Sequence, residues 1–324
     1  MRAMICRVWG APDQLRLEQV DTPQPAADQL RIKILASCVN YADTIMIQGH
    51  YQTRPDFPFA PGLEACGEVV ECGSAVTRFK IGDRVMAMLG YGGFAEEAVA
   101  SEIDCYPVPD EMSDDIAASF LIGYVSSHVA LRWQGKLESG ETLLVLGASG
   151  GVGLTAVEIG KALGATVIAG ASNAVKLDIA RGRGADELID YKADNLKERV
   201  AALTGGNGAN VCYDPVGGEL FDLALSSLAW GGRILLIGFV GGIPQIPANR
   251  LLVKNRSAMG SSLRYYREFR HDLMRASVEE LTGWWRDGKL KPLVTQSFPL
   301  EEVPAAMTEL LERRAVGRIV ITVA

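Results

Sequence analysis

The stretch TLLVLGASGGVGLTAVEIGKALG, residues 142–164, decides the fold of this chain. Its first residues, Thr142–Leu146, form a short apolar run typical of a buried strand, and small residues then interrupt the run before an amphipathic helical pattern begins. Strand, glycine turn and helix follow in the order of a dinucleotide-binding unit. In such a unit the backbone approaches a pyrophosphate, whose charge lies on the free N–H groups and positive dipole end of the helix.

The glycine motif departs from the usual pattern at one place. Gly150 and Gly153 stand at the second and third glycine positions, whereas Ala148 stands at the first. A glycine turn of this kind also occurs for packing alone, so the motif needs support from the surrounding chain. The residues predicted to contact a pyrophosphate are Ala148, Ser149, Gly150, Gly151, Val152 and Gly153.

Strand and helix patterns alternate after this stretch. We predict strands at 166–171, 187–190, 210–214, 233–238 and 258–262, with helices at 175–181, 195–203 and 220–228 between them. This alternation predicts an α/β fold with a parallel doubly wound sheet.

The chain before and after this region shows a different pattern of predicted secondary structure. Residues 1–121 contain short strand patterns separated by Gly and Pro, which indicates a β-barrel-like domain, and a helical pattern then runs from Ser113 to Leu137. The tail contains helical patterns at 270–287 and 303–313 and a last strand at 317–323. The expected domains are 1–120 with 264–324 for the barrel, and 121–263 for the parallel sheet.

Composition excludes several classes of function. The net charge is −7 and no basic cluster is present, which argues against nucleic acid as a partner. No run of about 18 apolar residues could span a membrane, and the first residues turn polar too soon for a signal peptide. The six cysteines form no CxxC pair and are expected to be reduced. We therefore expect a cytoplasmic protein.

The end of the second predicted strand of the parallel sheet bears on the choice of cofactor. A carboxylate normally binds the adenosine ribose there, but Ala171 occupies the position. Ser172 and Lys176 offer a hydroxyl and an ammonium group to a 2′-phosphate, Arg181 lies on the same helix, and Tyr191 is expected beside the adenine. These residues together favour NADPH over NADH, although Lys176 by itself is more typical of a solvated helix position.

Seven stretches together resemble a known family, and they cover essentially the whole chain. The sequence resembles the medium-chain dehydrogenase/reductase superfamily, and within it the zinc-independent quinone oxidoreductase group that includes zeta-crystallin. The resemblance implies a GroES-like substrate domain built from both chain ends, a Rossmann domain between them, a cleft at their junction and a homodimer through the sixth strands. The stretches are CVNYADTIMIQGHY (38–51), FPFAPGLEACGEVVECG (57–73), FKIGDRVMA (79–87), GGFAEEAV (92–99), LVLGASGGVG (144–153), YDPVGGELF (213–221) and GRIVITV (317–323).

The resemblance also implies that no metal is bound. Zinc-dependent relatives use a Cys, a His in a Gly-His-Glu sequence and a later Cys or Asp as ligands. The matching positions here are Asn40, Leu63 and the neighbourhood of Leu121 and Ile122, none of which is a zinc ligand. The four-cysteine structural lobe of those relatives is absent as well.

A hydride donor without a Lewis acid suits an acceptor that delocalises the incoming charge, such as a quinone or an α,β-unsaturated carbonyl. By resemblance, Asn40 is expected at the substrate carbonyl, with Tyr51 as a further donor and Tyr41 in a packing role. A tyrosine often occurs in related sequences where Ile45 stands, so that role does not transfer.

Other positions take their expected roles from the same resemblance. Ser126 matches a Thr that approaches the nicotinamide, although a helix-internal hydroxyl is the other interpretation. Arg264 and Tyr265 are expected to contact the substrate, although a surface salt bridge also accounts for Arg264. The residues expected beneath the nicotinamide ribose, beside the 214–217 turn, are Gly238, Phe239 and Val240.

Three functions follow in order of preference. The first is a zinc-free, NADPH-dependent reductase of quinones or activated enones. The second is an acryloyl-CoA or related enoyl-thioester reductase, which Arg264 would favour by binding a phosphate or carboxylate of the substrate. The third, of a different class, is a non-catalytic NADPH-binding protein with a structural or RNA-binding role.

Overall fold

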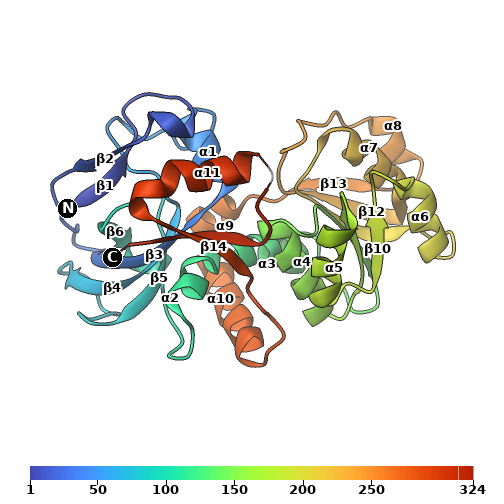
Figure 1. The fold of residues 1–324 in the computed structure, drawn as a ribbon. Helices are drawn as coiled ribbons and strands as arrows, with labels where there is room; N and C mark the ends of the chain where they lie inside the picture. The colour runs from blue at the N-terminus through green and yellow to red at the C-terminus, as the bar shows by residue number, and fades with distance from the viewer. Residues whose placement is uncertain (313, 324) are drawn as a thin grey trace. The chain divides into compact units, whose positions relative to one another are not determined.

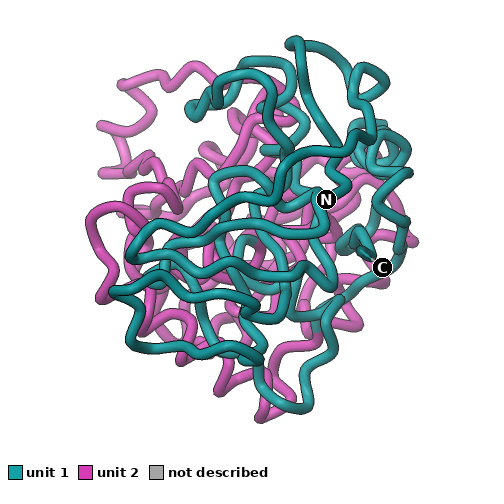
Figure 2. Tube along the Cα trace, turned by 90° about the vertical axis from the view of Figure 1, so that its left-hand side faces the viewer, with its two compact units in different colours: residues 1–122, 292–324 teal, residues 123–291 magenta. Residues whose placement is uncertain are grey.

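The computed structural model describes residues 1–312 and 314–323, and the chain divides into two compact units. Unit 1 contains Met1–Ile122 and Pro292–Ala324, and unit 2 contains Gly123–Lys291 (Figure 2). The end of the last predicted helix, at Arg313, and the terminal Ala324 lie outside the described residues.

Unit 1 is built around the long strand β3 (Gln29–Val39). Among its described residues, a seven-stranded sheet runs in the order β14-β15-β3-β4-β5-β7, with β6 also paired to β3, and β1 and β2 form a separate pair. Leu30, Ile32 and Ile34 alternate along β3 and fill the core, as the period-two pattern predicts. The remaining strands are β1 (Arg2–Ile5), β2 (Arg16–Gln19), β4 (Glu64–Cys72), β5 (Arg84–Met88), β6 (Glu97–Ser101), β7 (Cys105–Pro107), β14 (Val294–Pro299) and β15 (Arg318–Thr322).

The helices of unit 1 are short. The α-helices are α1 (Tyr41–Ile47), α2 (Asp114–Ala118) and α11 (Val303–Leu311), and the 3-10 turns are η1 (Pro12–Gln14), η2 (Glu102–Asp104) and η5 (Leu300–Glu302).

Unit 2 contains the predicted parallel sheet. Six described strands pair in parallel in the order β10-β9-β8-β11-β12-β13. This order reverses direction beside β8, which is the arrangement of a doubly wound sheet. The strands are β8 (Thr142–Leu146), β9 (Thr166–Ala171), β10 (Glu187–Asp190), β11 (Ala209–Asp214), β12 (Leu228–Leu236) and β13 (Ser257–Gly260).

Helices cover both faces of this sheet. Figure 1 shows α4 and α5 on one side and α6 on the other, and α6 and α7 share a core of buried residues with the sheet. Close packing is possible because Gly160 in α4 faces Leu143, which a Cβ would approach to 2.6 Å. The helices are α4 (Gly151–Ala162), α5 (Ala174–Gly182), α6 (Leu196–Leu203), α7 (Gly218–Ser227), α8 (Ala248–Leu252), α9 (Leu263–Phe269) and α10 (His271–Arg286).

The segment expected to be helical from Ser113 to Leu137 is helical over most of its length, with an interruption at Ser119 and Phe120. After α2, the π-helical turn η3 (Leu121–Val125), the short helix α3 (Ser126–His128) and the π-helical turn η4 (Val129–Gln134) follow one another. Side-chain hydrogen bonds from elsewhere in unit 2 hold this path, because Thr155 donates to the Gly123 carbonyl at 3.1 Å.

The second boundary between the units differs from the sequence expectation. The predicted boundary at 264 assigned α9 and α10 to the barrel, whereas both helices belong to unit 2. The side chains of α10 explain the difference: His128 bonds to Ser277 and Glu280 of this helix at 3.0 Å, and Trp133 donates to Ser277 at 2.9 Å.

Candidate functional site

The turn between β8 and α4 lies at the carboxyl edge of the parallel sheet. Gly147 has a φ of +59°, a conformation that side chains disfavour, and Gly150 N–H donates to the Gly147 carbonyl at 3.0 Å. Ala148 is fully buried, and its N–H donates to Gly170 at 3.1 Å. The alanine in the first glycine position is therefore accommodated, because the left-handed residue is Gly147.

Gly150 and Gly153 serve different purposes in this turn. A Cβ on Gly153 would lie 2.1 Å from the Gly147 carbonyl oxygen, so only glycine fits there. A Cβ on Gly150 would lie 3.4 Å from the same oxygen, an ordinary contact. Gly150 is thus dispensable for packing, and its missing side chain leaves room beside the first N–H groups of α4, which have no acceptor within the helix. This is a cradle that fits a pyrophosphate.

The ends of β9 and β10 bring three predicted residues to one end of this edge. Ser172 directly follows β9, and Asn173 caps α5 by accepting the Lys176 N–H at 3.0 Å. Lys176 is half-buried, and no carboxylate in the described chain pairs with its ammonium group. Tyr191 N–H donates to Ala171 at 3.1 Å, and a Cβ on Gly170 would touch the Tyr191 ring at 3.4 Å.

Arg181 does not belong to this group. It lies in the last turn of α5, roughly 10 Å along the helix from its first residue. It pairs with Asp178 at 3.2 Å and lines a separate hollow of about 450 Å³ with Lys161, Arg183, Lys289 and Lys291. Apart from Arg181, that hollow contains none of the residues expected to bind the cofactor or the substrate.

The loops that follow β11 and β12 are hydrogen-bonded to each other. Asp214 accepts the N–H groups of Val216 and Gly217 at 2.8 Å each. Gly241 N–H donates to Val216 at 2.7 Å. The Phe239 ring lies against Gly217, where a Cβ would touch it at 3.4 Å. The loop with Gly238, Phe239 and Val240 is thereby held beside the 214–217 turn, as the sequence predicted.

Asp214 was predicted only as part of the 214–217 turn at this edge of the sheet, without a role for its carboxylate. Burial raises its pKa, and Oδ2 is buried without a hydrogen-bond partner among the described residues. The YDPVGG stretch contained the signal, because Asp before a glycine turn commonly bonds to backbone N–H groups two or three residues ahead.

Ser126 is the first residue of α3 and is half-buried. Its neighbour Ser127 is fully buried and bonds to the hydroxyls of Thr155 and Tyr213 at 2.8 Å. Sequence reasoning missed this cluster, because nothing in the spacing of the three residues indicates that they meet.

Arg264 and Tyr265 lie on α9, half-exposed. Arg264 pairs with Glu268 of the same helix at 2.5 Å, which is the salt bridge that the sequence left open as an alternative. The Tyr265 ring packs edge-on against Tyr266, with ring centroids 5.4 Å apart, and also contacts Phe269. Both side chains thus have local partners within α9.

Asn40 lies at the centre of a buried polar cluster in unit 1. Its side-chain N–H groups donate to the Cys38 carbonyl at 3.2 Å and to Glu64 at 3.1 Å. Its Oδ1 accepts from Arg318 at 2.9 Å, and Arg318 also pairs with Glu64. Both amide hydrogens of Asn40 are therefore engaged within the protein. A contact with a substrate carbonyl requires one of these bonds to be exchanged.

Burial dominates the electrostatics of this cluster. It raises the pKa of Asp43 to about 7, although the carboxylate accepts the N–H groups of Asn40 and Gly62. It also raises the pKa of Glu64, which Arg318 opposes. Tyr51, the other predicted donor, is half-buried against the barrel core.

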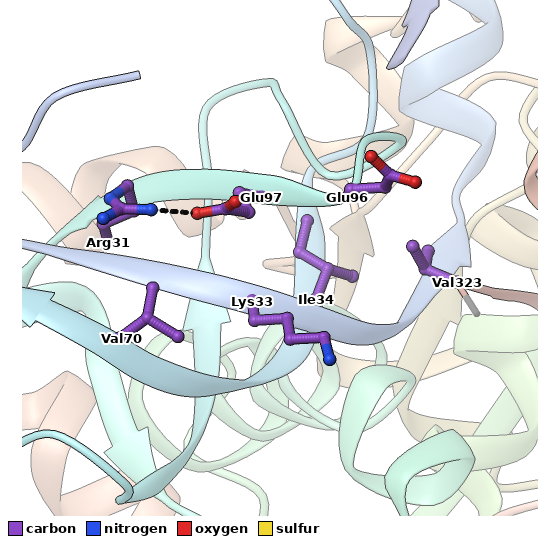
Figure 3. A pocket seen from close by; sticks show the side chains of 7 residues that line it. All are labelled: Arg31, Lys33, Ile34, Val70, Glu96, Glu97 and Val323. Carbon is purple, nitrogen blue, oxygen red and sulfur yellow. Dashed lines mark hydrogen bonds and ion pairs between the residues drawn. The ribbon is translucent and has the colours of Figure 1, made fainter. Parts of the chain in front are cut away.

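A smaller hollow of about 300 Å³ lies on the barrel (Figure 3). Arg31 pairs there with Glu97, and Lys33, Ile34 and Val70 complete much of the lining. None of the residues predicted to act in binding or catalysis lines it.

No group of three or more His, Cys, Asp or Glu side chains in the described part of the chain could hold a metal ion. The positions that the sequence resemblance matches to zinc ligands carry an amide at Asn40 and a buried apolar side chain at Leu63. No helix formed by residues 1–312 and 314–323 is both long and apolar enough to cross a membrane.

Comparison with known proteins agrees with this architecture. The family described as alcohol dehydrogenase GroES-like domain matches residues 26–110, and the family described as zinc-binding dehydrogenase matches residues 151–279. The chain is 39% identical, over 99% of its length and 88% of the relative, to a quinone oxidoreductase-like protein 2 homolog of Nematostella vectensis.

Two solved structures extend the comparison. A mycobacterial protein complexed with NADPH has a TM-score of 0.93 at 32% identity, with 99% of each chain covered. Escherichia coli quinone oxidoreductase complexed with NADPH has a TM-score of 0.94 at 27% identity, covering 99% of this chain and 100% of that one. The predicted combination of GroES-like and Rossmann domains is confirmed. The chain belongs to the medium-chain dehydrogenase/reductase superfamily, among its quinone oxidoreductase-like members.

Proposed function

We propose that this protein binds NADPH and transfers a hydride from it to a quinone or an α,β-unsaturated carbonyl compound, without a metal ion. The observation that carries the proposal is the carboxyl edge of the parallel sheet. It combines the open cradle at Gly150, the absence of a carboxylate at Ala171, and a Lys176 without a carboxylate partner among the described residues. The NADPH complexes of two structural neighbours support it.

Each of these residues has a proposed task. The first N–H groups of α4 bind the pyrophosphate, Ser172 and Lys176 bind the 2′-phosphate, and the Tyr191 ring lies against the adenine. The 214–217 turn and the loop from Gly238 to Val240 support the nicotinamide ribose, and Ser126 contacts the nicotinamide.

The bound cofactor supplies the hydride. A quinone or enone that accepts it becomes an anion, which hydrogen-bond donors stabilise until a proton arrives from solvent or a tyrosine. Asn40 and Tyr51 are the proposed donors, and Arg264 and Tyr265 are proposed contacts to the rest of the substrate. The Arg264–Glu268 pair weakens the argument for an enoyl-thioester, because it already neutralises the guanidinium.

The test is to follow NADPH oxidation with a naphthoquinone, a small enone and acryloyl-CoA side by side. We expect turnover of the quinone or the enone and little of acryloyl-CoA. Preferred turnover of acryloyl-CoA would replace the proposal with the thioester reductase. NADPH binding without turnover of any of the three compounds would favour the third hypothesis, a non-catalytic NADPH-binding protein. Salt-sensitive retention of RNA would then support an RNA-binding role for that protein.

We also propose a cytoplasmic homodimer formed through the outer edge of β13. This strand ends the described sheet, and large apolar side chains flank it: Trp230, Leu252 and Val253 are 71%, 77% and 64% exposed. Gly231 N–H donates to Lys254 at 2.8 Å, so these side chains lie in neighbouring segments. Apolar groups beside an open strand edge are typical of an interface. Light scattering after size-exclusion chromatography would show a monomer if this is wrong.

A further inference from the structure

Three buried hydroxyl groups meet in unit 2. The Ser127 hydroxyl lies 2.8 Å from the hydroxyls of both Thr155 and Tyr213. Ser127 and Tyr213 have no exposed surface, and Thr155 is 5% exposed. The three residues come from α3, α4 and β11, so the cluster joins three separate elements.

The donors and acceptors of this cluster can be matched completely. Burial raises the pKa of the Tyr213 phenol, which therefore stays protonated and donates to Ser127. The Ser127 proton is then available to the Thr155 hydroxyl at 2.8 Å, and the Thr155 proton to the Gly123 carbonyl at 3.1 Å. Removing one hydroxyl leaves a buried partner unsatisfied.

Each member of the cluster adjoins a segment with a proposed NADPH contact. Ser127 follows Ser126, Tyr213 precedes the Asp214 turn, and Thr155 lies in the second turn of α4, the helix that follows the glycine turn. Two π-helical turns flank α3, a feature frequent at functional sites. We propose that Ser127, Thr155 and Tyr213 are positioning residues that hold these three segments in register for the nicotinamide half of NADPH. The inference rests on the proposed function.

The adenosine half should not depend on this cluster. The sheet order places β10 and β9 on one side of β8, and β11 and β12 on the other. Ser172, Lys176 and Tyr191 follow β9 and β10, whereas the cluster ties α3 and α4 to β11. Disturbing the hydroxyls should therefore affect one half of the nucleotide and spare the other.

The experiment compares two ligands on single variants. The variants Tyr213→Phe, Thr155→Val and Ser127→Ala each remove one hydroxyl with little change in volume. Dissociation constants are measured for NADPH and for adenosine 2′,5′-bisphosphate, which lacks the nicotinamide half. Steady-state kcat, KM for NADPH and the thermal unfolding midpoint are measured on the same samples. Ser227→Ala is the matched control, because Ser227 is a buried serine that donates only to Leu223 within α7.

We expect NADPH binding to weaken about three- to tenfold in the cluster variants, the loss of one hydrogen bond, with a fall in kcat. Binding of adenosine 2′,5′-bisphosphate should change less than about twofold, and Ser227→Ala should change neither constant. A merely structural role would weaken both ligands together or only lower the unfolding midpoint, and either result overturns the inference. If one variant does not fold, the ligand binding of the other two tests the inference. If none of the three folds, the cluster serves folding alone and the inference is overturned. If the unmodified protein binds neither ligand, the proposed function itself is wrong.

Discussion

Arg318 donates a hydrogen bond to the side-chain oxygen of Asn40 at 2.9 Å, and both side chains are buried. The two residues are 278 positions apart, on the last strand and at the start of α1. Arg318 also pairs with the buried Glu64, so one guanidinium joins the C-terminal strand both to Asn40 and to the start of β4.

Replacing Arg318 should therefore destabilise unit 1 strongly. We expect Arg318→Met to lower the free energy of unfolding by about 3–5 kcal/mol, because the Glu64 charge remains buried without its partner. Urea denaturation measures the change. Arg7→Met is the control, since the Arg7–Glu18 pair is exposed on the arginine side and its loss should change the free energy of unfolding far less. The double variant Arg318→Met with Glu64→Gln should recover part of the loss, and equal effects of Arg318→Met and Arg7→Met would contradict this account.

The two glycines of the nucleotide turn should respond differently to alanine. Gly153→Ala places a methyl group 2.1 Å from a carbonyl oxygen and should cost about 1–3 kcal/mol of folding free energy. Gly150→Ala meets no such obstacle, so its unfolding free energy should stay within about 0.5 kcal/mol. Its dissociation constant for NADPH should nevertheless rise at least about tenfold, because the methyl group occupies the cradle. Unchanged NADPH binding in Gly150→Ala would show that the pyrophosphate does not bind at this turn.

Lys176 should distinguish the two nicotinamide cofactors. We expect Lys176→Ala to raise the dissociation constant for NADPH by about ten- to a hundredfold, the range of a charge-assisted hydrogen bond, and to leave that for NADH nearly unchanged. Fluorescence titration with both cofactors gives the ratio. Arg181→Ala removes a cation from the same helix that pairs with Asp178, and it should not alter the ratio. Equal losses for NADPH and NADH in Lys176→Ala would refute the phosphate contact.

His128 should make stability depend on pH. Burial lowers the pKa of His128 to about 4, although Glu280 opposes the shift. The unfolded chain takes up a proton near pH 6.5 and the folded chain does not, so this contribution to stability is complete above about pH 6.5 and is lost as the pH falls toward 4. The slope reaches at most about 1.4 kcal/mol per pH unit.

The measurement is urea denaturation of the protein and of His128→Gln between pH 7 and pH 4, with the difference taken at each pH. The glutamine variant should be less stable at pH 7 and should lose this part of the pH dependence. Parallel curves for the two proteins would show that another group is responsible.

Much of unit 2 could be predicted from the sequence because its signals are local. The predicted strands at 166–171 and 187–190 agree with β9 and β10 at both ends. A parallel strand buried on both faces needs a continuous apolar run, and a helix must follow to cross back, so composition along the chain suffices. The helical segment expected from Ser113 is interrupted at Ser119 and Phe120 and continues as π-helical turns around α3, because its path depends on hydrogen bonds to Thr155 and Ser277 that no local pattern contains.

The polar side chains at the carboxyl edge of the parallel sheet could also be located from local sequence signals. Ser172 and Tyr191 immediately follow β9 and β10, and Lys176 lies in the first turn of the helix after β9. Parallel strands present their carboxyl ends at one edge. Arg181 shares a helix with Lys176, yet its position in the last turn takes it to another hollow. Five residues along a helix were enough to place Arg181 away from Lys176, so closeness in sequence did not indicate a shared site.

The sequence by itself determined the order of strands and helices, the glycine turn and the missing carboxylate at Ala171, because each depends on neighbouring residues alone. Only the tertiary structure decided that Arg318 and Glu64 engage Asn40, that Gly147 rather than Ala148 takes the left-handed conformation, and that Ser127 meets Thr155 and Tyr213. The first and the last of these are contacts between residues distant in the chain. A buried polar group must find a partner somewhere, but the sequence does not say which one, since that is fixed only when the elements pack.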